Sequence, residues 1–214
     1  MLAALILDFD GLILDTETPL LDSWERVHAD HGFVYDREKG HNIIGHSDVY
    51  YDPWEAFPAD HDRAQLEAEF ERVKESIVRQ QPILPGITNL IDAADHASLN
   101  LGIASNSNHD HVEGHLYRLG LHGRFATFAC RDDVTHPKPA PDVYQLACSQ
   151  LGIAPGAALA FEDSVPGHLA AHRAGLPVVV VPNPSTRQYE FEHARKRLES
   201  MEEFDLEAFI SSAS

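Results

Sequence analysis

Short apolar runs alternate with amphipathic segments along most of this chain. Five runs of four to six residues stand out, at 4–7, 101–105, 125–130, 158–163 and 177–182. Continuous apolar runs of this length are typical of strands that are buried on both faces of a sheet. Strand-to-helix alternation predicts an α/β fold, a doubly wound parallel sheet with helices on both faces.

The segments between these runs carry helix start and stop residues. Prolines open two of the helical patterns, near Pro141 and at Pro166, and Gly152 and Gly175 follow them at the far ends. A third pattern begins after Asn108, whose side chain can cap a helix. After Asn183 the charged sequence predicts a further helix to about Glu203.

One interval breaks the alternation, because almost one hundred residues separate the first two apolar runs. Residues 16–82 contain at least two helical patterns, one of them over 60–81, and no convincing strand. We therefore predict a core domain of residues 1–15 and 83–214, with residues 16–82 inserted as a small helical cap. Its position directly after two acidic residues favours a lid over a site.

Composition narrows the classes of partner. Sixteen basic against thirty-four acidic residues give a formal net charge of −18, so neither nucleic acid nor an anionic membrane is an expected partner. An anionic substrate would need local positive charge from a metal ion or a lysine. The two cysteines fit a reduced, cytoplasmic protein, and the fourteen scattered histidines are expected to lie mainly on the solvated surface.

The first apolar run ends in an acidic pair, Asp8 and Asp10, followed by Gly11. Residues two apart on an extended segment point the same way, so the two carboxylates share a face and repel each other. A divalent cation such as Mg²⁺ would relieve this repulsion, and so would a proton on one acid. The pair also resembles the metal-binding DxD of sugar-nucleotide transferases.

Other expected strand ends carry complementary groups. Ser105 ends the second run, and together with Asn106, which follows it, forms a candidate cradle for an anion. Lys138 stands between prolines, and Glu162 and Asp163 end the fourth run. Ligands of parallel sheets bind beyond the carboxyl ends of the strands, where all of these residues are expected. A nucleophile, an acid–base group, a hydroxyl, a cation and metal-binding carboxylates together fit phosphoryl transfer to an aspartate.

Four stretches, DFDGLILDTE, IASNS, KPAPD and FEDSVPGHLAAHRAGL, resemble in order the four motifs of the haloacid dehalogenase superfamily. The resemblance covers nearly the whole chain and is closest to the helical-cap branch that includes β-phosphoglucomutases and phosphoglycolate phosphatases. It implies a Rossmann-like core, a helical cap and Mg²⁺ as the cofactor.

The resemblance also implies a role for each matched residue. Asp8 would be the nucleophile, Asp10 would exchange protons with the leaving group and water, and Ser105 and Lys138 would hold the phosphoryl group. Asn106 joins them as a substrate-binding candidate, and His46 is a further one in the insertion. The implied metal ligands are Asp8, Asp10, Glu162 and Asp163.

The insertion departs from the sugar-phosphate mutases of that group. Leu20 stands where they carry a histidine, and Asp48 stands where they carry a basic residue that binds a second phosphate group. Both differences favour a phosphatase acting on a small phosphorylated metabolite. A mutase, a dehalogenase and a non-catalytic phosphate-binding regulator remain alternatives, of which Asp10 and the Glu162–Asp163 pair disfavour the dehalogenase. The sequence fixes neither the ester nor the oligomeric state.

Overall fold

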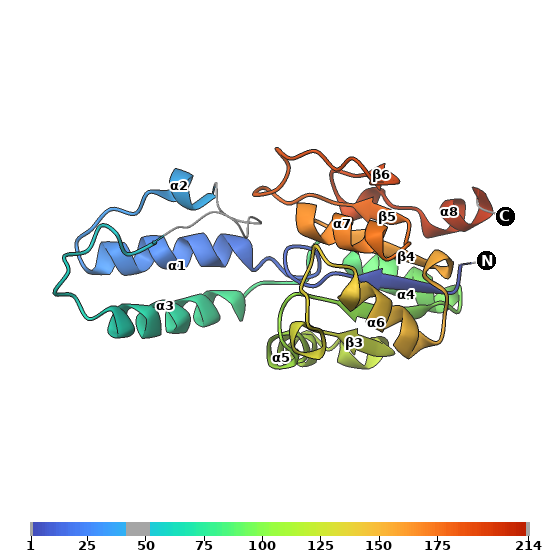
Figure 1. The fold of residues 1–214 in the computed structure, drawn as a ribbon, viewed down its shortest axis with the longest axis horizontal. Helices are drawn as coiled ribbons and strands as arrows, with labels where there is room; N and C mark the ends of the chain where they lie inside the picture. Colours follow the sequence, from blue (N-terminus) through green and yellow to red (C-terminus); the bar gives the residue numbers. More distant parts are fainter. Residues whose placement is uncertain (1, 42–51, 213–214) are drawn as a thin grey trace. The chain divides into compact units, whose positions relative to one another are not determined.

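A computed structural model describes residues 2–41 and 52–212 of the chain (Figure 1). It divides the chain into two compact units. The core unit comprises Met1–Leu14 and Ile83–Ser214, and the helical unit comprises Asp15–Pro82. No helix in the described part of the chain is both long and apolar enough to cross a membrane.

The core unit is built on a six-stranded sheet in the order β3-β2-β1-β4-β5-β6, with every neighbouring pair parallel. In the register, Leu7 at the end of β1 lies opposite Ile103 and Phe161. The carboxyl ends of the three central strands therefore meet at one edge. The strands are β1 (Ala4–Leu7), β2 (Asn100–Ala104), β3 (Thr127–Ala129), β4 (Ala158–Glu162), β5 (Val178–Val180) and β6 (Lys196–Arg197).

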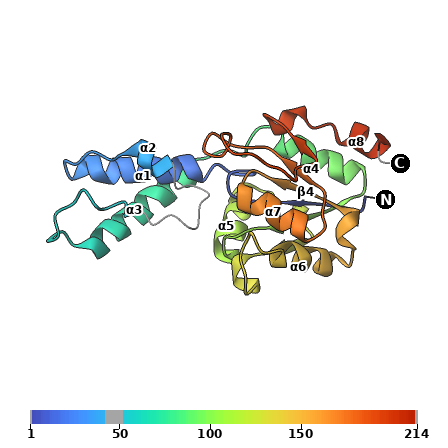
Figure 2. The ribbon, with the colours of Figure 1, turned by 45° about the horizontal axis from the view of Figure 1, so that its top comes forward.

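Helices cover both faces of this sheet, with α4 and α8 on one side and α6 and α7 on the other (Figures 1 and 2). Every residue of β1 and β4 is buried, which requires cover on both faces because successive side chains point to opposite sides. The predicted doubly wound parallel sheet is confirmed. The helices of the unit are α4 (Ile87–His96), α5 (His109–Arg118), α6 (Asp142–Leu151), α7 (Val165–Arg173) and α8 (Leu206–Ser212), with 3₁₀ turns at His122–Arg124, Arg131–Asp133, Pro155–Ala157 and Met201–Glu203.

Local sequence sets the helix ends beside the sheet edge. The Asn108 side chain accepts a hydrogen bond of 3.0 Å from the backbone N–H of His111 and so caps α5. Ser164 caps α7 in the same way through the N–H of Gly167, at 3.1 Å. Both caps fix where a helix begins after a strand, as the sequence predicts for Asn108.

The helix predicted from Asn183 to about Glu203 is wrong. This segment forms turns and the short strand β6, and a 3₁₀ turn follows at Met201–Glu203. The Arg197 guanidinium donates hydrogen bonds to the carbonyls of Tyr189 and Arg187, at 3.2 and 2.7 Å. These bonds and the pairing of β6 with β5 satisfy backbone groups that a helix would otherwise pair internally.

The helical unit contains α1 (Glu17–Asp30), α2 (Arg37–His41) and α3 (Arg63–Val78). Its core is aromatic: Trp24 of α1 stacks on Phe70 of α3, with ring centroids 5.4 Å apart and an angle of 15°. His28 lies among these rings, stacked on Trp54 at 5.5 Å, and its Nδ1 lies 2.7 Å from the carbonyl of Trp24. The unit therefore buries the imidazole of His28 in a largely apolar aromatic cluster.

His28 makes the stability of the helical unit depend on pH. Burial lowers the pKa of His28 below its ordinary value, so the unfolded chain takes up a proton at a higher pH than the folded one. This contribution to stability is present above the unfolded pKa of about 6.5 and is lost as the pH falls through the lowered folded pKa. We expect amide exchange in α1, corrected for intrinsic rate, to show less protection at pH 5 than at pH 7.5.

His28→Phe keeps an aromatic ring at this position and removes the proton. In this variant the difference in α1 protection between the two pH values should shrink. An unchanged difference would contradict the assignment of this pH dependence to His28.

Candidate active site

A tight turn directly after β1 sets the position of the two predicted acids. The N–H of Gly11 donates to the carbonyl of Leu14 at 2.8 Å, and the N–H of Ile13 donates to that of Phe9 at 2.9 Å. Gly11 has φ +77°, and a Cβ there would lie 2.2 Å from Oδ2 of Asp163. Glycine is therefore required behind the acidic pair, both for the turn and for the close approach of Asp163.

Lys138 links the acids at the ends of two strands. Its Nζ donates to Oδ1 of Asp8 at 2.7 Å and to Oε1 of Glu162 at 2.6 Å. The lysine side chain is 3 % exposed, and the carboxylates of Asp8 and Glu162 are 9 % and 0 % exposed. In the sequence Lys138 is 130 positions from Asp8 and 24 positions from Glu162, yet the three residues form one buried ion-pair cluster.

Glu162 is saturated with donors from the protein. Its Oε1 also accepts from the Tyr144 hydroxyl at 2.6 Å, and its Oε2 accepts from the Ser164 hydroxyl at 3.2 Å. Gly167 permits this arrangement, because a Cβ there would lie about 2 Å from the Glu162 carboxylate. These bonds hold Glu162 in a fixed orientation toward Lys138.

The cluster carries more negative than positive charge. Burial and the neighbouring charge of Glu162 together raise the pKa of Asp8 to about 7, against the opposing effect of Lys138. Burial disfavours the Lys138 ammonium, but the charges of Asp8 and Glu162 outweigh burial and hold the pKa of Lys138 above its ordinary value. Lys138 is thus a permanent cation, and any further positive charge nearby would stabilise the ionised form of Asp8.

Asp163 completes a set of oxygen ligands that fits a divalent cation. Oxygen atoms of Asp8, Glu162 and Asp163 lie within 4.8 Å of one another, and all three residues are buried. The Asn183 side chain donates to Oδ2 of Asp163 at 2.7 Å and fixes this carboxylate. Carboxylate oxygens are the ligands that Mg²⁺ prefers, and a bound cation would offset the excess negative charge of the cluster.

Ser105 and Asn106 follow β2 at the same edge. The Ser105 hydroxyl accepts a hydrogen bond of 3.0 Å from the N–H of Ser107. Asn106 pairs with the backbone of Lys138, accepting from its N–H at 2.8 Å and donating to its carbonyl at 3.3 Å. The Asn106 side chain therefore positions the segment that carries the lysine.

Asp10 points its carboxylate at the start of α5. Its Oδ2 accepts from the Ser107 hydroxyl at 2.7 Å, and its Oδ1 lies 2.9 Å from Nε2 of His111. The structure thus brings every predicted site residue of the core unit to one edge of the sheet: Asp8, Asp10, Ser105, Asn106, Lys138, Glu162 and Asp163. His46, the candidate in the insertion, lies outside the described residues.

Four residues of this edge escape the sequence analysis, namely Ser107, His111, Tyr144 and Asn183. Tyr144 lies in an apolar helical pattern, where the sequence predicts a core residue. Ser107 and His111 look like an ordinary loop residue and an ordinary residue at the start of a helix. Most of the described histidines are at least partly exposed, as expected, whereas His28, His115 and His168 are buried. Ser107 and Asn183 each stand three residues past a strand end, which is a local indication of such a role, whereas the positions of Tyr144 and His111 carry no such indication.

A second group of side chains of the kinds that bind metals lies next to this edge, but hydrogen bonds within the protein explain its arrangement. It consists of His109, Cys130, Asp132 and Asp133. The two ring nitrogens of His109 lie 2.7 Å from carboxylate oxygens of Glu113 and Asp133. Burial opposes the charged ring, but these carboxylates outweigh it and raise the pKa of His109, which favours an imidazolium without a lone pair for a metal.

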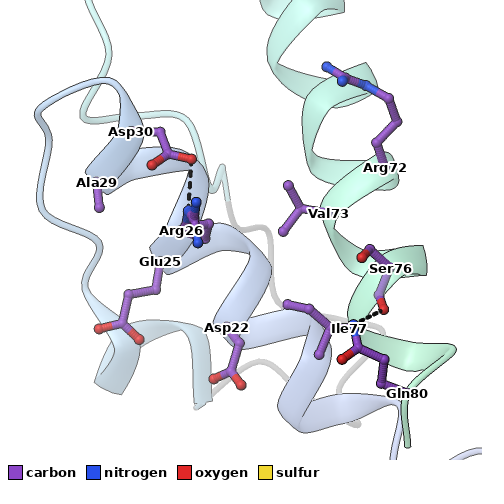
Figure 3. Close-up of a pocket in the computed structure, with 10 residues that line it drawn as sticks. All are labelled: Asp22, Glu25, Arg26, Ala29, Asp30, Arg72, Val73, Ser76, Ile77 and Gln80. Carbon is purple, nitrogen blue, oxygen red and sulfur yellow. Dashed lines mark hydrogen bonds and ion pairs between the residues drawn. The ribbon is translucent and has the colours of Figure 1, made fainter.

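The helical unit has an open groove of about 770 Å³ between α1 and α3 (Figure 3). Its charges are largely paired within the unit: Arg26 with Asp30 at 2.8 Å, and Asp22 with Arg37 at 2.6 Å. Its lining holds no cluster comparable to that around Lys138. The residues that line it are Asp22, Glu25, Arg26, Ala29, Asp30, Arg72, Val73, Ser76, Ile77 and Gln80.

A parallel α/β sheet with buried carboxylates, a lysine and hydroxyls at its carboxyl edge defines an enzyme of the phosphoryl-transfer type. The chain belongs to the haloacid dehalogenase-like hydrolase family, whose model matches residues 5–181. The predicted superfamily is therefore confirmed.

Curated relatives and a solved structure agree with this assignment. The chain is 37% identical over 210 residues to YhcW of Bacillus subtilis (strain 168), covering 96% of this chain and 95% of YhcW. It is 32% identical over 184 residues to the fructose-1-phosphate phosphatase YqaB of Escherichia coli (strain K12), covering 84% of this chain and 96% of YqaB.

The crystal structure of CbbY from Rhodobacter sphaeroides in complex with phosphate superimposes with a TM-score of 0.77. The two chains are 28% identical, and the match covers 95% of this chain and 96% of CbbY. Hydrolysis of phosphoric monoesters is the class of activity that these relatives support.

Proposed function

We propose that this protein is a Mg²⁺-dependent phosphatase that hydrolyses a small-molecule phosphate monoester through an aspartyl phosphate on Asp8. The observation that carries the proposal is the buried cluster in which Lys138 bridges Asp8 and Glu162 beside Asp163. A fixed cation next to a carboxylate nucleophile suits attack on an anionic phosphoryl group, because it stabilises the charge that develops there.

In the first half-reaction, a carboxylate oxygen of Asp8 attacks phosphorus and the bond from phosphorus to the ester oxygen breaks. Asp10 gives its proton to the departing alkoxide, so an alcohol leaves. Lys138 and the Ser105 hydroxyl stabilise the phosphoryl oxygens during transfer. Glu162 and Asn106 keep Lys138 in place through its ammonium and its backbone.

In the second half-reaction, Asp10 takes a proton from water while the water oxygen attacks phosphorus. The bond between phosphorus and Asp8 then breaks, which releases inorganic phosphate and restores the carboxylate. Asp10 ends this step protonated, as the next turnover requires. One group therefore serves as acid and then as base, as microscopic reversibility demands.

Asp8, Asp163 and the backbone carbonyl of Asp10 would hold the metal ion, with Asn183 orienting Asp163. When bound, Mg²⁺ would supply positive charge that offsets the charge of the phosphoryl group and of the buried acids. Both oxygens of Glu162 already accept hydrogen bonds from protein donors, so we assign Glu162 mainly to holding Lys138.

The substrate class rests on the relatives and on the helical unit. YqaB is named as a fructose-1-phosphate phosphatase, which supports a sugar phosphate or a metabolite of similar size here. Leu20, where the mutases carry a histidine, packs against the hydrophobic core of the helical unit and offers no polar group. This favours hydrolysis over a mutase reaction. The two cysteines are free and buried, in keeping with the proposed cytoplasmic location.

The direct test measures phosphate released from a panel of phosphorylated metabolites and from p-nitrophenyl phosphate. We expect hydrolysis that EDTA abolishes and Mg²⁺ restores. Mg²⁺ should also raise the midpoint of thermal unfolding of the EDTA-treated protein, because an ion that binds only the folded state stabilises it.

Asp163→Asn provides the matched control for the metal. It keeps the size of the side chain and should weaken both the Mg²⁺-dependent shift in melting temperature and the activity. Hydrolysis that persists in EDTA at the wild-type rate would refute Mg²⁺ dependence, and an absence of phosphate release from every ester would refute the phosphatase.

A further inference from the structure

Both carboxylate oxygens of Asp10 are engaged by residues that follow β2. The Ser107 hydroxyl donates to Oδ2 at 2.7 Å, and Nε2 of His111 lies 2.9 Å from Oδ1. When Asp10 is ionised it only accepts, so Nε2 of His111 then donates the hydrogen of this bond. Ser107 and His111 are four residues apart, so one short segment forms hydrogen bonds with both oxygens of Asp10.

His111 is itself held in a fixed orientation. Its ring lies nearly perpendicular to that of Phe9, with centroids 5.7 Å apart and an angle of 88°, and it packs against the ring of His115 at 4.8 Å and 74°. Phe9 is the fully buried residue between the two acids of the motif. The backbone N–H of His111 donates to the Asn108 cap, so the main chain is fixed as well.

These contacts make the segment from Ser107 to His111 a second support for Asp10, additional to the turn after β1. The side chain of Asp10 sits 27 % exposed and that of His111 31 % exposed, so neither is confined by burial alone. A part-exposed carboxylate rotates among several conformers unless bonds select one. Two hydrogen bonds to its two oxygens select a single direction for the carboxylate.

We infer that His111, together with Ser107, is a positioning residue that aims the Asp10 carboxylate for proton transfer to the leaving group. The inference rests on the proposed phosphatase activity and deepens it. His111 acts through Asp10 and needs no contact with the substrate. Its loss should therefore matter most when the leaving group must be protonated as it departs.

The test compares two esters in one variant series. An alkyl phosphate from the panel releases a poor leaving group that requires a proton, whereas p-nitrophenyl phosphate releases a stable anion that leaves without one. The comparison uses kcat/KM, because this quantity reports transfer to Asp8 and leaves out the later hydrolysis step that both esters share. For His111→Leu we expect kcat/KM on the alkyl ester to fall about 10- to 100-fold, a range typical for loss of a partner that orients a metal ligand. The loss of kcat/KM on p-nitrophenyl phosphate should be several-fold smaller.

His111→Gln tests rescue, because its amide can still donate a hydrogen bond to Asp10. It should retain more activity on the alkyl ester than His111→Leu. His109→Gln is the matched control, two residues away on the same helix, with Glu113 and Asp133 as its ring partners. Its ratio of the two kcat/KM values should equal that of the wild type.

A double-mutant comparison isolates the part of the His111 effect that is exerted through Asp10. In an Asp10→Asn background, His111→Leu should add little further loss to the single-turnover rate of alcohol release. Losses that multiply would overturn the inference, and so would equal losses on the two esters, which indicate a merely structural role. If wild-type protein releases no phosphate from any ester, the proposed function itself fails; if it is active and the ratio does not change, the role of His111 alone is refuted.

Discussion

Asp8→Asn should abolish phosphatase turnover while leaving the protein folded. The amide keeps the size of the carboxylate and can still accept the hydrogen bond from Lys138, but it cannot form the aspartyl phosphate. We expect kcat on p-nitrophenyl phosphate to fall by about 10⁴-fold or more, as happens when a covalent nucleophile is removed. Steady-state hydrolysis measured with saturating Mg²⁺ tests this directly.

The same substitution should not lower thermal stability when the metal is absent. Burial and the charge of Glu162 raise the pKa of Asp8 to about 7, so its ionised form is costly in the fold. This cost grows as the pH rises through 7, and Asn removes it. In EDTA at pH 8, the melting temperature of Asp8→Asn should equal or exceed that of the wild type.

Asp110→Asn serves as the control for this variant, because Asp110 is an exposed acid of α5 in the same unit. It should retain wild-type activity. Wild-type turnover by Asp8→Asn would exclude Asp8 as the nucleophile, and a large loss of stability would show that the amide disrupts the site rather than its chemistry.

Lys138→Met should combine the largest loss of stability with a large loss of activity. Lys138 is the cation between Asp8 and Glu162, and its removal leaves two buried carboxylates facing each other. Breaking one partner of a buried ion pair costs about 3–5 kcal/mol of unfolding free energy. Loss of its stabilisation of the phosphoryl oxygens should lower kcat by a further ~10²–10³-fold.

The stability loss in Lys138→Met should depend on pH. A carboxyl whose folded pKa is raised favours the fold at low pH, and this contribution is lost as the pH rises through the folded pKa. Urea unfolding in EDTA should therefore show a smaller deficit at pH 5 than at pH 8. Lys196→Met, at an exposed position in β6, is the matched control and should change stability by less than about 0.5 kcal/mol. Equal midpoints for Lys138→Met and wild type would contradict a buried ion-pair cluster.

The positions of the central strands and helices could be predicted from the sequence because their causes are local. The apolar run at 158–163 becomes β4, buried throughout, since only a strand covered on both faces accepts such a run. Asn108 starts α5 and Gly152 ends α6 at φ +67°, because a side-chain cap and a left-handed residue act within one turn. Neither needs a distant contact.

Other elements could not be predicted because distant partners decide them. Lys196 and Arg197 carry no apolar pattern, yet they form β6 by pairing with Val179 and Val180. The charged sequence of that region instead predicts a helix. His28 and His168 are buried although histidine composition alone favours the surface, because the neighbours that enclose a ring come from elsewhere in the fold.

The sequence alone determined which acids, hydroxyls and lysine gather at one place. Each follows an apolar strand, and parallel strands present their carboxyl ends at the same edge of the sheet. Only the tertiary structure decided what each group bonds to: Lys138 to Asp8 and Glu162, Asn183 to Asp163, and His111 to Asp10 across 101 positions of sequence. The positions of the strands follow from local sequence patterns, whereas the direction and pKa of a side chain depend on neighbours that meet only when the chain folds.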